Sequence, residues 1–221
     1  MTPNAALFFA AGLGTRMAPL TDDRPKPMIE VAGKPLLRHA MDMAEGIERK
    51  VVNVHYRAGQ IRDAVADGVM ISDETDQLLE TGGGLRKALP LLGDGPVFTM
   101  NTDAVWKGPN PFDMLRSAWR DEMGGLLLLI DPQDARGHVG KGDFVVDKNS
   151  RVTPGQGLIY TGCQIIRPDR RSEVETDAFS MWELWNRLLE ERSLYGLRYT
   201  GNWCDVGRPD CIPIAEEMLR Q

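Results

Sequence analysis

The stretch from Leu7 to Leu37 constrains this chain most, because a glycine pair and a proline-flanked lysine follow an apolar run within it. Gly12 and Gly14 let the backbone turn sharply and bring its N–H groups close to an anion. Lys26 lies between two prolines, which fix the backbone on both sides and remove N–H donors that a helix or sheet would use. The stretch therefore predicts a buried strand, then a loop that holds a polyphosphate and a lysine.

The order of residues in this stretch excludes the two commonest phosphate loops. A dinucleotide loop needs a third glycine near position 17, where the chain has Met17, and a Walker loop needs Gly-Lys-Ser/Thr. The stretch instead resembles the signature of the sugar-1-phosphate nucleotidyltransferases, G-x-G-T-R followed by P-L-T and K-P. The residues that carry this resemblance are Gly12, Gly14, Thr15, Arg16, Pro19, Leu20, Thr21, Pro25, Lys26 and Pro27.

The resemblance implies roles for these residues. Arg16 would hold the outgoing pyrophosphate and Lys26 the region of the α-phosphate, so these two are the expected catalytic residues. The expected nucleotide-binding residues come from this loop and from a second glycine-rich segment: Ala11, Gly12, Gly14, Thr15, Glu80, Thr81, Gly82 and Gly83.

Composition limits the architecture and the partners. A chain of 221 residues with 42% hydrophobic and 26% charged residues can bury one large core, so a single domain over residues 1–221 is expected. A net charge of −6 argues against nucleic acid or an anionic membrane as partner. The segment from Gly12 to Arg38 nevertheless holds five basic residues against three acidic ones, which suits a small anionic substrate.

Cysteine usage and the amino terminus indicate the compartment. Cys163, Cys204 and Cys211 form an odd set without C-x-x-C spacing, which favours buried thiols in a reducing compartment. Met1 to Asn4 does not resemble the start of a signal peptide, and the sequence has no apolar run of about 18 residues. A cytoplasmic protein is expected.

Short apolar runs alternate with helical patterns over the first 130 residues, which predicts an α/β fold with a mostly parallel sheet flanked by helices. Together with the motifs, this indicates a Rossmann-like nucleotidyltransferase domain. The expected strands are 5–10, 51–55, 69–72, 97–100 and 126–130, and the expected helices are 35–47, 60–66, 85–92 and 111–123. Beyond residue 131, strands at 143–147 and 158–167 predict a small additional β region that covers the ligand. A helix at 180–192, extended chain at 197–206 and a helix at 210–220 follow.

Two aspartates are the expected magnesium ligands. Asp103 follows the strand 97–100, and carboxyl ends of strands are where open α/β sheets bind ligands. Because Mg²⁺ takes one or two carboxylates plus phosphate oxygens, a second acid is expected far along the chain. Asp205, in Trp-Cys-Asp-Val-Gly, resembles the family's W-x-D-V/I-G element; its alternative role is that of a turn residue.

Base recognition is expected from Leu79 to Gly84. Three consecutive glycines would let a base lie against the main chain; the alternative is a flexible start of the helix that follows. This segment and the residues from Lys87 to Asp94 resemble the N-acetylmuramate-1-phosphate uridylyltransferase branch of the family. The short chain, without an appended repeat domain, agrees with that branch.

The sugar site is expected further along the chain. Gly140 to Phe144 resembles the G-[RK]-G-D-F stretch of that branch, and Tyr160 to Gly162 its strand beneath the sugar ring. Many relatives have Glu-Lys-Pro ahead of that strand, and its lysine binds the sugar phosphate. Here the corresponding residues, Asp147 to Asn149, differ from that pattern, and Lys141 is the alternative residue for binding the sugar phosphate. The expected sugar-phosphate residues are Asn101, Lys141, Gly142, Asp143, Thr161 and Gly162.

Histidines and tryptophans are expected to be structural. The three histidines, His39, His55 and His138, lack metal-binding spacing. The five tryptophans, including Trp182 and Trp185, suit packing better than base stacking.

The sequence thus predicts a Mg²⁺-dependent enzyme that converts UTP and a sugar 1-phosphate, foremost N-acetylmuramic acid 1-phosphate, to UDP-sugar and pyrophosphate. It is expected to be a monomer or small homo-oligomer with no nucleic-acid or membrane partner. Two alternatives stay open. One is the same reaction with glucose, mannose or choline-type phosphates and UTP, dTTP, GTP or CTP; the other is a catalytically silent nucleotide-sugar sensor.

Overall fold

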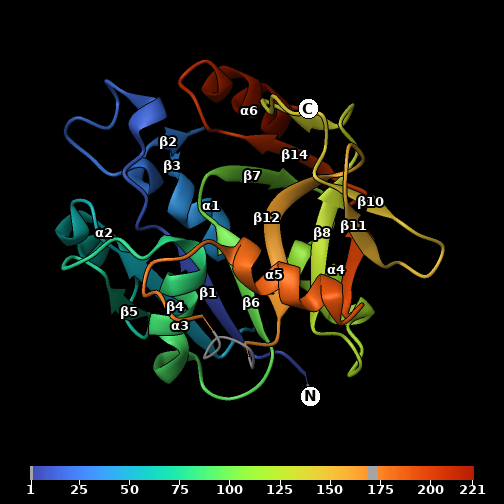
Figure 1. Cartoon of the computed structure of the whole chain (residues 1–221). Helices are drawn as coiled ribbons and strands as arrows, with labels where there is room; N and C mark the ends of the chain where they lie inside the picture. Colours follow the sequence, from blue (N-terminus) through green and yellow to red (C-terminus); the bar gives the residue numbers. More distant parts are fainter. Residues whose placement is uncertain (1, 169–173) are drawn as a thin grey trace.

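A seven-stranded sheet forms the centre of the molecule (Figure 1). The computed structural model describes residues 2–168 and 174–221. The strand order is β13-β8-β12-β6-β1-β4-β5, and within this sheet β12 alone runs against its neighbours. The strands are β1 (Ala5–Phe9), β4 (Arg49–Val54), β5 (Met70–Asp73), β6 (Val97–Asn101), β8 (Gly125–Ile130), β12 (Ile159–Ile166) and β13 (Leu194–Arg198). The mostly parallel sheet predicted from the sequence is confirmed.

Helices cover both faces of this sheet. Side chains alternate along each strand, so residues such as Phe8 join one core cluster and their neighbours, such as Leu7, join the other. The Phe8 face packs against α1 (Leu36–Asp42), α2 (Ala58–Ala64) and α4 (Pro111–Ala118). The Leu7 face packs against α3 (Glu80–Leu92) and α5 (Met181–Glu190), which lie in front of the sheet in Figure 1.

Short strands form the additional β region. Strands β7 (Ala104–Lys107), β14 (Asn202–Asp205) and β9 (Ala135–Arg136) make a three-stranded sheet, on which α6 (Cys211–Arg220) packs. Strands β10 (Phe144–Val146) and β11 (Val152–Pro154) form a hairpin, and β2 (Glu30–Val31) pairs with β3 (Lys34–Pro35). The extended chain predicted at 197–206 is therefore two strands, β13 and β14, in different sheets.

The glycine-rich segment lies inside a helix, which begins at Glu80 and not at Leu85 as the sequence predicted. Helix α3 begins at Glu80, so Gly82, Gly83 and Gly84 lie in its first turns and are buried. A Cβ on Gly82 would collide with the ring of Phe179, and one on Gly83 with the carbonyl oxygen of Asp177. These glycines therefore allow residues 177–180 to pack directly on the helix backbone.

All three cysteines are buried and carry free thiols, as predicted. Within residues 2–168 and 174–221, no helix has both the length and the apolar character needed to cross a bilayer.

Candidate active site

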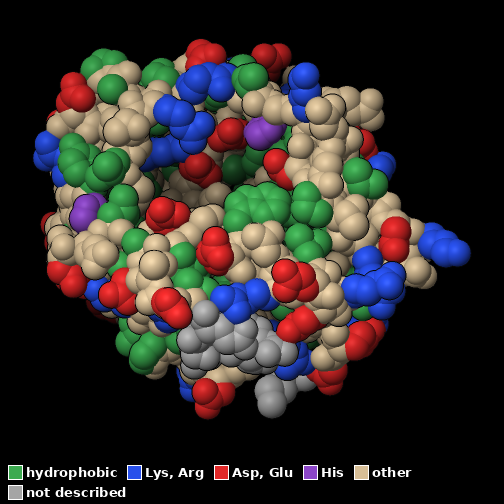
Figure 2. All heavy atoms as spheres, viewed as in Figure 1, with side chains coloured by type: hydrophobic (Ala, Val, Ile, Leu, Met, Phe, Trp, Pro, Cys, Tyr) green, Lys and Arg blue, Asp and Glu red, His purple; other side chains and the backbone are tan. Residues whose placement is uncertain are grey.

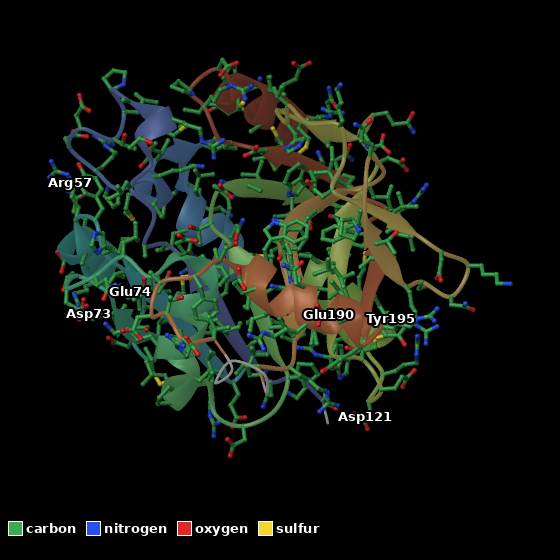
Figure 3. All side chains as sticks on the ribbon, viewed as in Figure 1. Arg57, Asp73, Glu74, Asp121, Glu190 and Tyr195 are labelled. Atoms are coloured by element: carbon green, nitrogen blue, oxygen red, sulfur yellow. The ribbon has the colours of Figure 1, made fainter. Side chains whose placement is uncertain are left out.

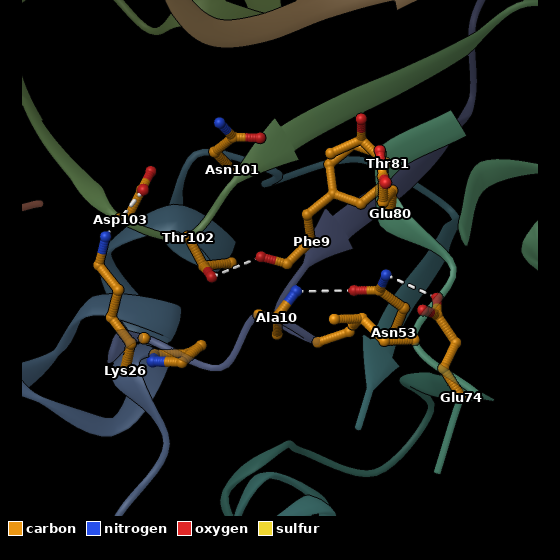
Figure 4. A pocket seen from close by; sticks show the side chains of 15 residues that line it. Phe9, Ala10, Lys26, Asn53, Glu74, Glu80, Thr81, Asn101, Thr102 and Asp103 are labelled. Carbon is orange, nitrogen blue, oxygen red and sulfur yellow. Dashed lines mark hydrogen bonds and ion pairs between the residues drawn. The ribbon is translucent and has the colours of Figure 1, made fainter. Parts of the chain in front are cut away.

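A cavity of about 260 Å³ lies at the edge of the sheet where β1, β4 and β6 end (Figure 4). Parallel strands that end at one edge bring residues from distant parts of the chain together. The cavity is lined by Phe9, Ala10, Ala11, Gly12, Gly14, Lys26, Pro27, Asn53, Glu74, Leu78, Glu80, Thr81, Asn101, Thr102 and Asp103. We call it the first cavity.

The glycine loop folds tightly against Lys26. Gly14 has a φ of +67°, and a Cβ there would lie 2.8 Å from the Lys26 Cβ, so only glycine fits. The hydroxyl of Thr21 donates to the Gly14 carbonyl oxygen at 3.1 Å and closes the loop. Ala11, Gly12 and Gly14 line the first cavity, whereas Thr15 and Arg16 are exposed in the short 3₁₀ helix Thr15–Met17 beside it.

Lys26 and Asp103 form an ion pair inside the first cavity. Lys26 Nζ lies 2.9 Å from Asp103 Oδ2, and the two side chains are 11% and 32% exposed. The proline-flanked segment at Lys26 is a 3₁₀ helix, Lys26–Met28, which presents the lysine to the carboxyl end of β6. A partly shielded pair of this kind keeps both charges at a fixed place.

Asp205 lies next to this pair because β14 is antiparallel to β7, with Asp205 opposite Ala104. Burial raises the pKa of the Asp205 carboxyl, and the negative charge of Asp103 raises that pKa further. Lys26, His138 and Arg16 act on this pKa in the opposite direction. The structure therefore brings Lys26, Asp103 and Asp205 together, and Arg16 is near enough to influence the charge of Asp205.

The two carboxylates fit magnesium. They lie close enough to repel, and a divalent cation between them would relieve that repulsion. Among the described residues no group of three or more His, Cys, Asp and Glu side chains gathers at one point. A site with two carboxylates leaves coordination positions for phosphate oxygens and water, as Mg²⁺ prefers.

His138 is a neighbour of this centre that the sequence did not reveal. Its Nδ1 lies 3.7 Å from Asp205 Oδ2, on a glycine-rich loop whose pattern gave no metal-like spacing. His39 and His55 fit the structural role that was predicted. His39 Nε2 is hydrogen-bonded to the Val31 carbonyl oxygen at 2.9 Å, and His55 Nδ1 to that of Glu74 at 2.6 Å.

The segment predicted to read the base contributes only partly to the first cavity. Glu80 and Thr81 line it, and Glu80 has a φ of +59°, a strained value for a side chain of this kind. Gly82 and Gly83 do not line it. Their N–H groups donate to the Phe179 carbonyl oxygen at 2.9 and 3.1 Å, so these two donors are already used within the protein.

A second cavity of about 230 Å³ adjoins the first and shares Phe9, Thr81 and Asn101 with it. Its other lining residues are Asp143, Phe144, Tyr160, Gln164, Ser180, Met181, Trp182 and Trp185. Trp182 packs on Phe144 with ring centres 5.3 Å apart, and it is 38% exposed, so part of its ring also faces the second cavity. Figure 2 shows the hollow with charged side chains on its rim and an apolar patch beside it.

The predicted sugar residues separate into three groups. Asn101 and Asp143 line the second cavity, and Gly162 makes room for Asn101, since a Cβ there would lie 2.9 Å from its side chain. Thr161 is buried and donates to the Leu128 carbonyl oxygen at 2.7 Å, so its hydroxyl hydrogen is already used within the sheet. Gly142 and Lys141 line neither cavity; Gly142 packs against Gly157, and Lys141 is exposed.

Asn53 and Glu74 were not singled out in the sequence, yet both line the first cavity. The sequence pattern that pointed to Asp103 also applies to them. Each is a polar residue near the carboxyl end of a parallel strand, β4 for Asn53 and β5 for Glu74.

A mostly parallel α/β sheet with a lysine, two carboxylates and a glycine loop at its carboxyl edge defines a nucleotidyltransferase. Comparison with known proteins agrees, and the chain belongs to the family of MobA-like NTP transferase domains, whose model matches residues 6–152. Its relatives include an N-acetylmuramate α-1-phosphate uridylyltransferase from Caulobacter vibrioides, which is 38% identical over 99% of this chain and 98% of the relative. A second, from Neisseria meningitidis serogroup B, is 34% identical over 91% and 92%. The resemblance to sugar-1-phosphate nucleotidyltransferases that the motifs indicated is thereby confirmed.

A solved structure supports the fold. The inositol-1-phosphate CTP transferase of T. maritima superposes with a TM-score of 0.81 at 17% identity, covering 100% of this chain and 96% of that one.

Proposed function

We propose that this enzyme transfers the uridylyl group of UTP to a sugar 1-phosphate, foremost N-acetylmuramic acid α-1-phosphate, and releases pyrophosphate. One observation carries the proposal: Lys26 lies 2.9 Å from Asp103 with Asp205 beside them, in a cavity that adjoins a second one. Two adjoining cavities suit a reaction of two substrates. The names of the two uridylyltransferase relatives support the choice of UTP and of the sugar.

In this proposal the first cavity takes the nucleotide. The loop Ala11 to Thr15 holds the triphosphate, and Glu80 and Thr81 face the base. Asp103 and Asp205 hold Mg²⁺, which when bound neutralises phosphate charge and orients the reacting groups. The whole chain acts as one domain, because the site draws on residues from both of its ends.

The reaction needs little from protein side chains beyond position and charge. A phosphate oxygen of the sugar 1-phosphate, already a nucleophile, forms a bond to the α-phosphorus of UTP as the bond from that phosphorus to the bridging oxygen breaks. Pyrophosphate leaves with the bond electrons. Lys26 offsets the charge that grows at the α-phosphate, and Arg16, which is exposed at the mouth of the site, attracts the pyrophosphate.

The second cavity takes the sugar. Asn101 lies where the two cavities meet and faces the phosphate of the sugar 1-phosphate. Asp143 accepts a hydrogen bond from the Tyr160 N–H at 2.8 Å, which holds the start of β10 against β12. The exposed face of Trp182 offers an apolar platform for the acetamido group of the sugar. Lys141, in the exposed loop nearby, attracts the anionic sugar phosphate.

A pyrophosphate-release assay over a grid of nucleotides and sugar phosphates tests the proposal. The grid pairs UTP, dTTP, GTP and CTP with the 1-phosphates of N-acetylmuramic acid, N-acetylglucosamine, glucose and mannose, with Mg²⁺ and with chelator. The expected result is release with UTP and N-acetylmuramic acid 1-phosphate that disappears with the chelator and in Asp103→Ala. Release confined to another pair would replace the substrates, and no release with any pair would favour a silent sensor.

A further inference from the structure

A chain of hydrogen bonds with a buried carboxylate at its centre crosses the floor of the first cavity. The Ala10 N–H donates to Asn53 Oδ1 at 2.7 Å, and Asn53 Nδ2 donates to Glu74 Oε1 at 2.8 Å (Figure 4). The other carboxylate oxygen of Glu74 accepts from the Leu79 N–H at 3.3 Å. Glu74, labelled in Figure 3, has no exposed surface, and Asn53 is 2% exposed.

The Glu74 carboxylate determines which groups donate and which accept in this series of hydrogen bonds. A carboxylate only accepts, so the NH₂ group of Asn53 must face Glu74 and its oxygen must face the Ala10 N–H. Gly84 leaves room for the pair, because a Cβ there would lie 2.8 Å from Glu74 Oε1 and 2.9 Å from Asn53 Nδ2. Burial raises the pKa of Glu74, while the hydrogen bonds from Asn53 and Leu79 lower it.

The hydrogen bonds run from Ala10 to Leu79, and these two residues lie on different sides of the first cavity. Ala10 opens the glycine loop, and Leu79 precedes Glu80 and Thr81, which line the opposite side. Both oxygens of Glu74 are occupied by protein donors, so its effect on a ligand passes through these neighbours.

We propose that Glu74 is a positioning residue for the nucleotide. It holds the loop that begins at Ala10 and the start of α3 at a fixed separation, so that the phosphates and the base of one nucleotide can bind at the same time. This inference rests on the proposed function only in that the first cavity takes the nucleoside triphosphate.

Glu74→Gln is the first test, because glutamine keeps the shape but has one side-chain acceptor where the two donors need two. A buried donor left unpaired weakens the structure that holds it, so KM for the nucleotide should rise about tenfold, with kcat and KM for the sugar phosphate within about threefold of the wild type.

The double variant Asn53→Asp with Glu74→Gln is the matched rescue. The carboxylate introduced at position 53 can accept from the Ala10 N–H and from the new amide at position 74, and the oxygen of that amide can accept from the Leu79 N–H. Every link is restored and the net charge is unchanged. The nucleotide KM should therefore return to within about threefold of the wild type, whereas Asn53→Asp alone places two carboxylates together and should raise it.

Gly84→Ala is a second route if Glu74→Gln does not fold, since its Cβ would separate Asn53 from Glu74 without removing a hydrogen-bonding group. It should raise the nucleotide KM in the same way. An unchanged nucleotide KM in Glu74→Gln, even with a lowered melting temperature, would overturn the inference, and so would a failure of the double variant to restore KM.

The wild-type enzyme is measured first with UTP, dTTP, GTP and CTP, and the variants are then measured with the nucleotide that it uses. Use of a nucleotide other than UTP would refute the proposed substrate while leaving the test of Glu74 intact.

Discussion

The backbone N–H of Val206 donates to the carbonyl oxygen of Asp103 at 2.8 Å. This bond, and the pairing of Asp205 with Ala104, bring together two carboxylates that lie about a hundred residues apart in the sequence. Their separation is set by backbone hydrogen bonds, so it does not depend on a bound ion to bring the two segments together.

Asp205→Asn should reduce kcat by at least about a thousandfold, because it removes one of two carboxylates that would hold Mg²⁺. The melting temperature should stay equal or rise, since burial and the charge of Asp103 both disfavour the ionised form of Asp205. Pyrophosphate release and thermal unfolding measure the two effects. Asp94→Asn, at an exposed site, is the control. Near-normal turnover in Asp205→Asn would remove this residue from the mechanism.

Lys26→Met should lower kcat about 100-fold, because it removes a positive charge held in the cavity while keeping much of the side-chain length. Lys34→Met is the matched control. Lys34 pairs with Asp42 at 2.8 Å, but its side chain is 42% exposed, and exposed pairs contribute little. Steady-state kinetics with both substrates would compare the two variants, and an equal loss in both would contradict a specific role for Lys26.

Trp182→Ala should raise KM for the sugar phosphate about tenfold and leave KM for the nucleotide unchanged, since the ring lines only the second cavity. Ile214→Ala in α6 is the control, because Ile214 is 39% exposed, close to the 38% of Trp182. Initial-rate measurements with each substrate varied in turn distinguish the two Michaelis constants. A change in the nucleotide KM alone would refute the assignment of the second cavity.

Gly83→Ala should lower the free energy of unfolding by about 1–3 kcal/mol, because the new methyl group would collide with the Asp177 carbonyl oxygen. Gly59→Ala should instead raise it by about 0.5–1 kcal/mol, since that helical position has open space around it. Urea denaturation measures both. Equal stability of the two variants would contradict the close packing of residues 177–180 on α3.

His39→Gln should change how stability depends on pH. Burial lowers the pKa of His39 below its ordinary value of 6.5, so the unfolded chain takes up a proton more readily than the folded one. The wild type therefore loses stability as the pH falls below about 6.5. The variant lacks this contribution, and its melting temperature should fall less between pH 7.5 and 5.5. Identical slopes in the two proteins would disprove the shift.

The elements predicted from the sequence were those that depend on local pattern. Apolar runs located β1, β4 and β6, and a carboxylate after a strand located Asp103, because parallel strands place such residues at the ligand edge. The packing of residues 177–180 on the triple glycine was not predicted, since it depends on Phe179, nearly a hundred residues away. No local pattern carries the identity of a packing partner so distant in sequence.

The same limit explains the residues that were missed. Trp182 lies on a helix whose period indicates only which side is apolar, and its place in a cavity wall depends on Phe144 from the β10–β11 hairpin. Asn53 and Glu74 become a pair only once β4 and β5 lie side by side.

The pairing of β14 with β7 across about a hundred residues of sequence has a consequence for biosynthesis. During translation β7 must wait with an open edge until β14, which carries Asp205, has been made about a hundred residues later. A nascent chain that stops before β14 carries only one of the two aspartates, Asp103. Premature termination before β14 would therefore leave a product without the second carboxylate of the site.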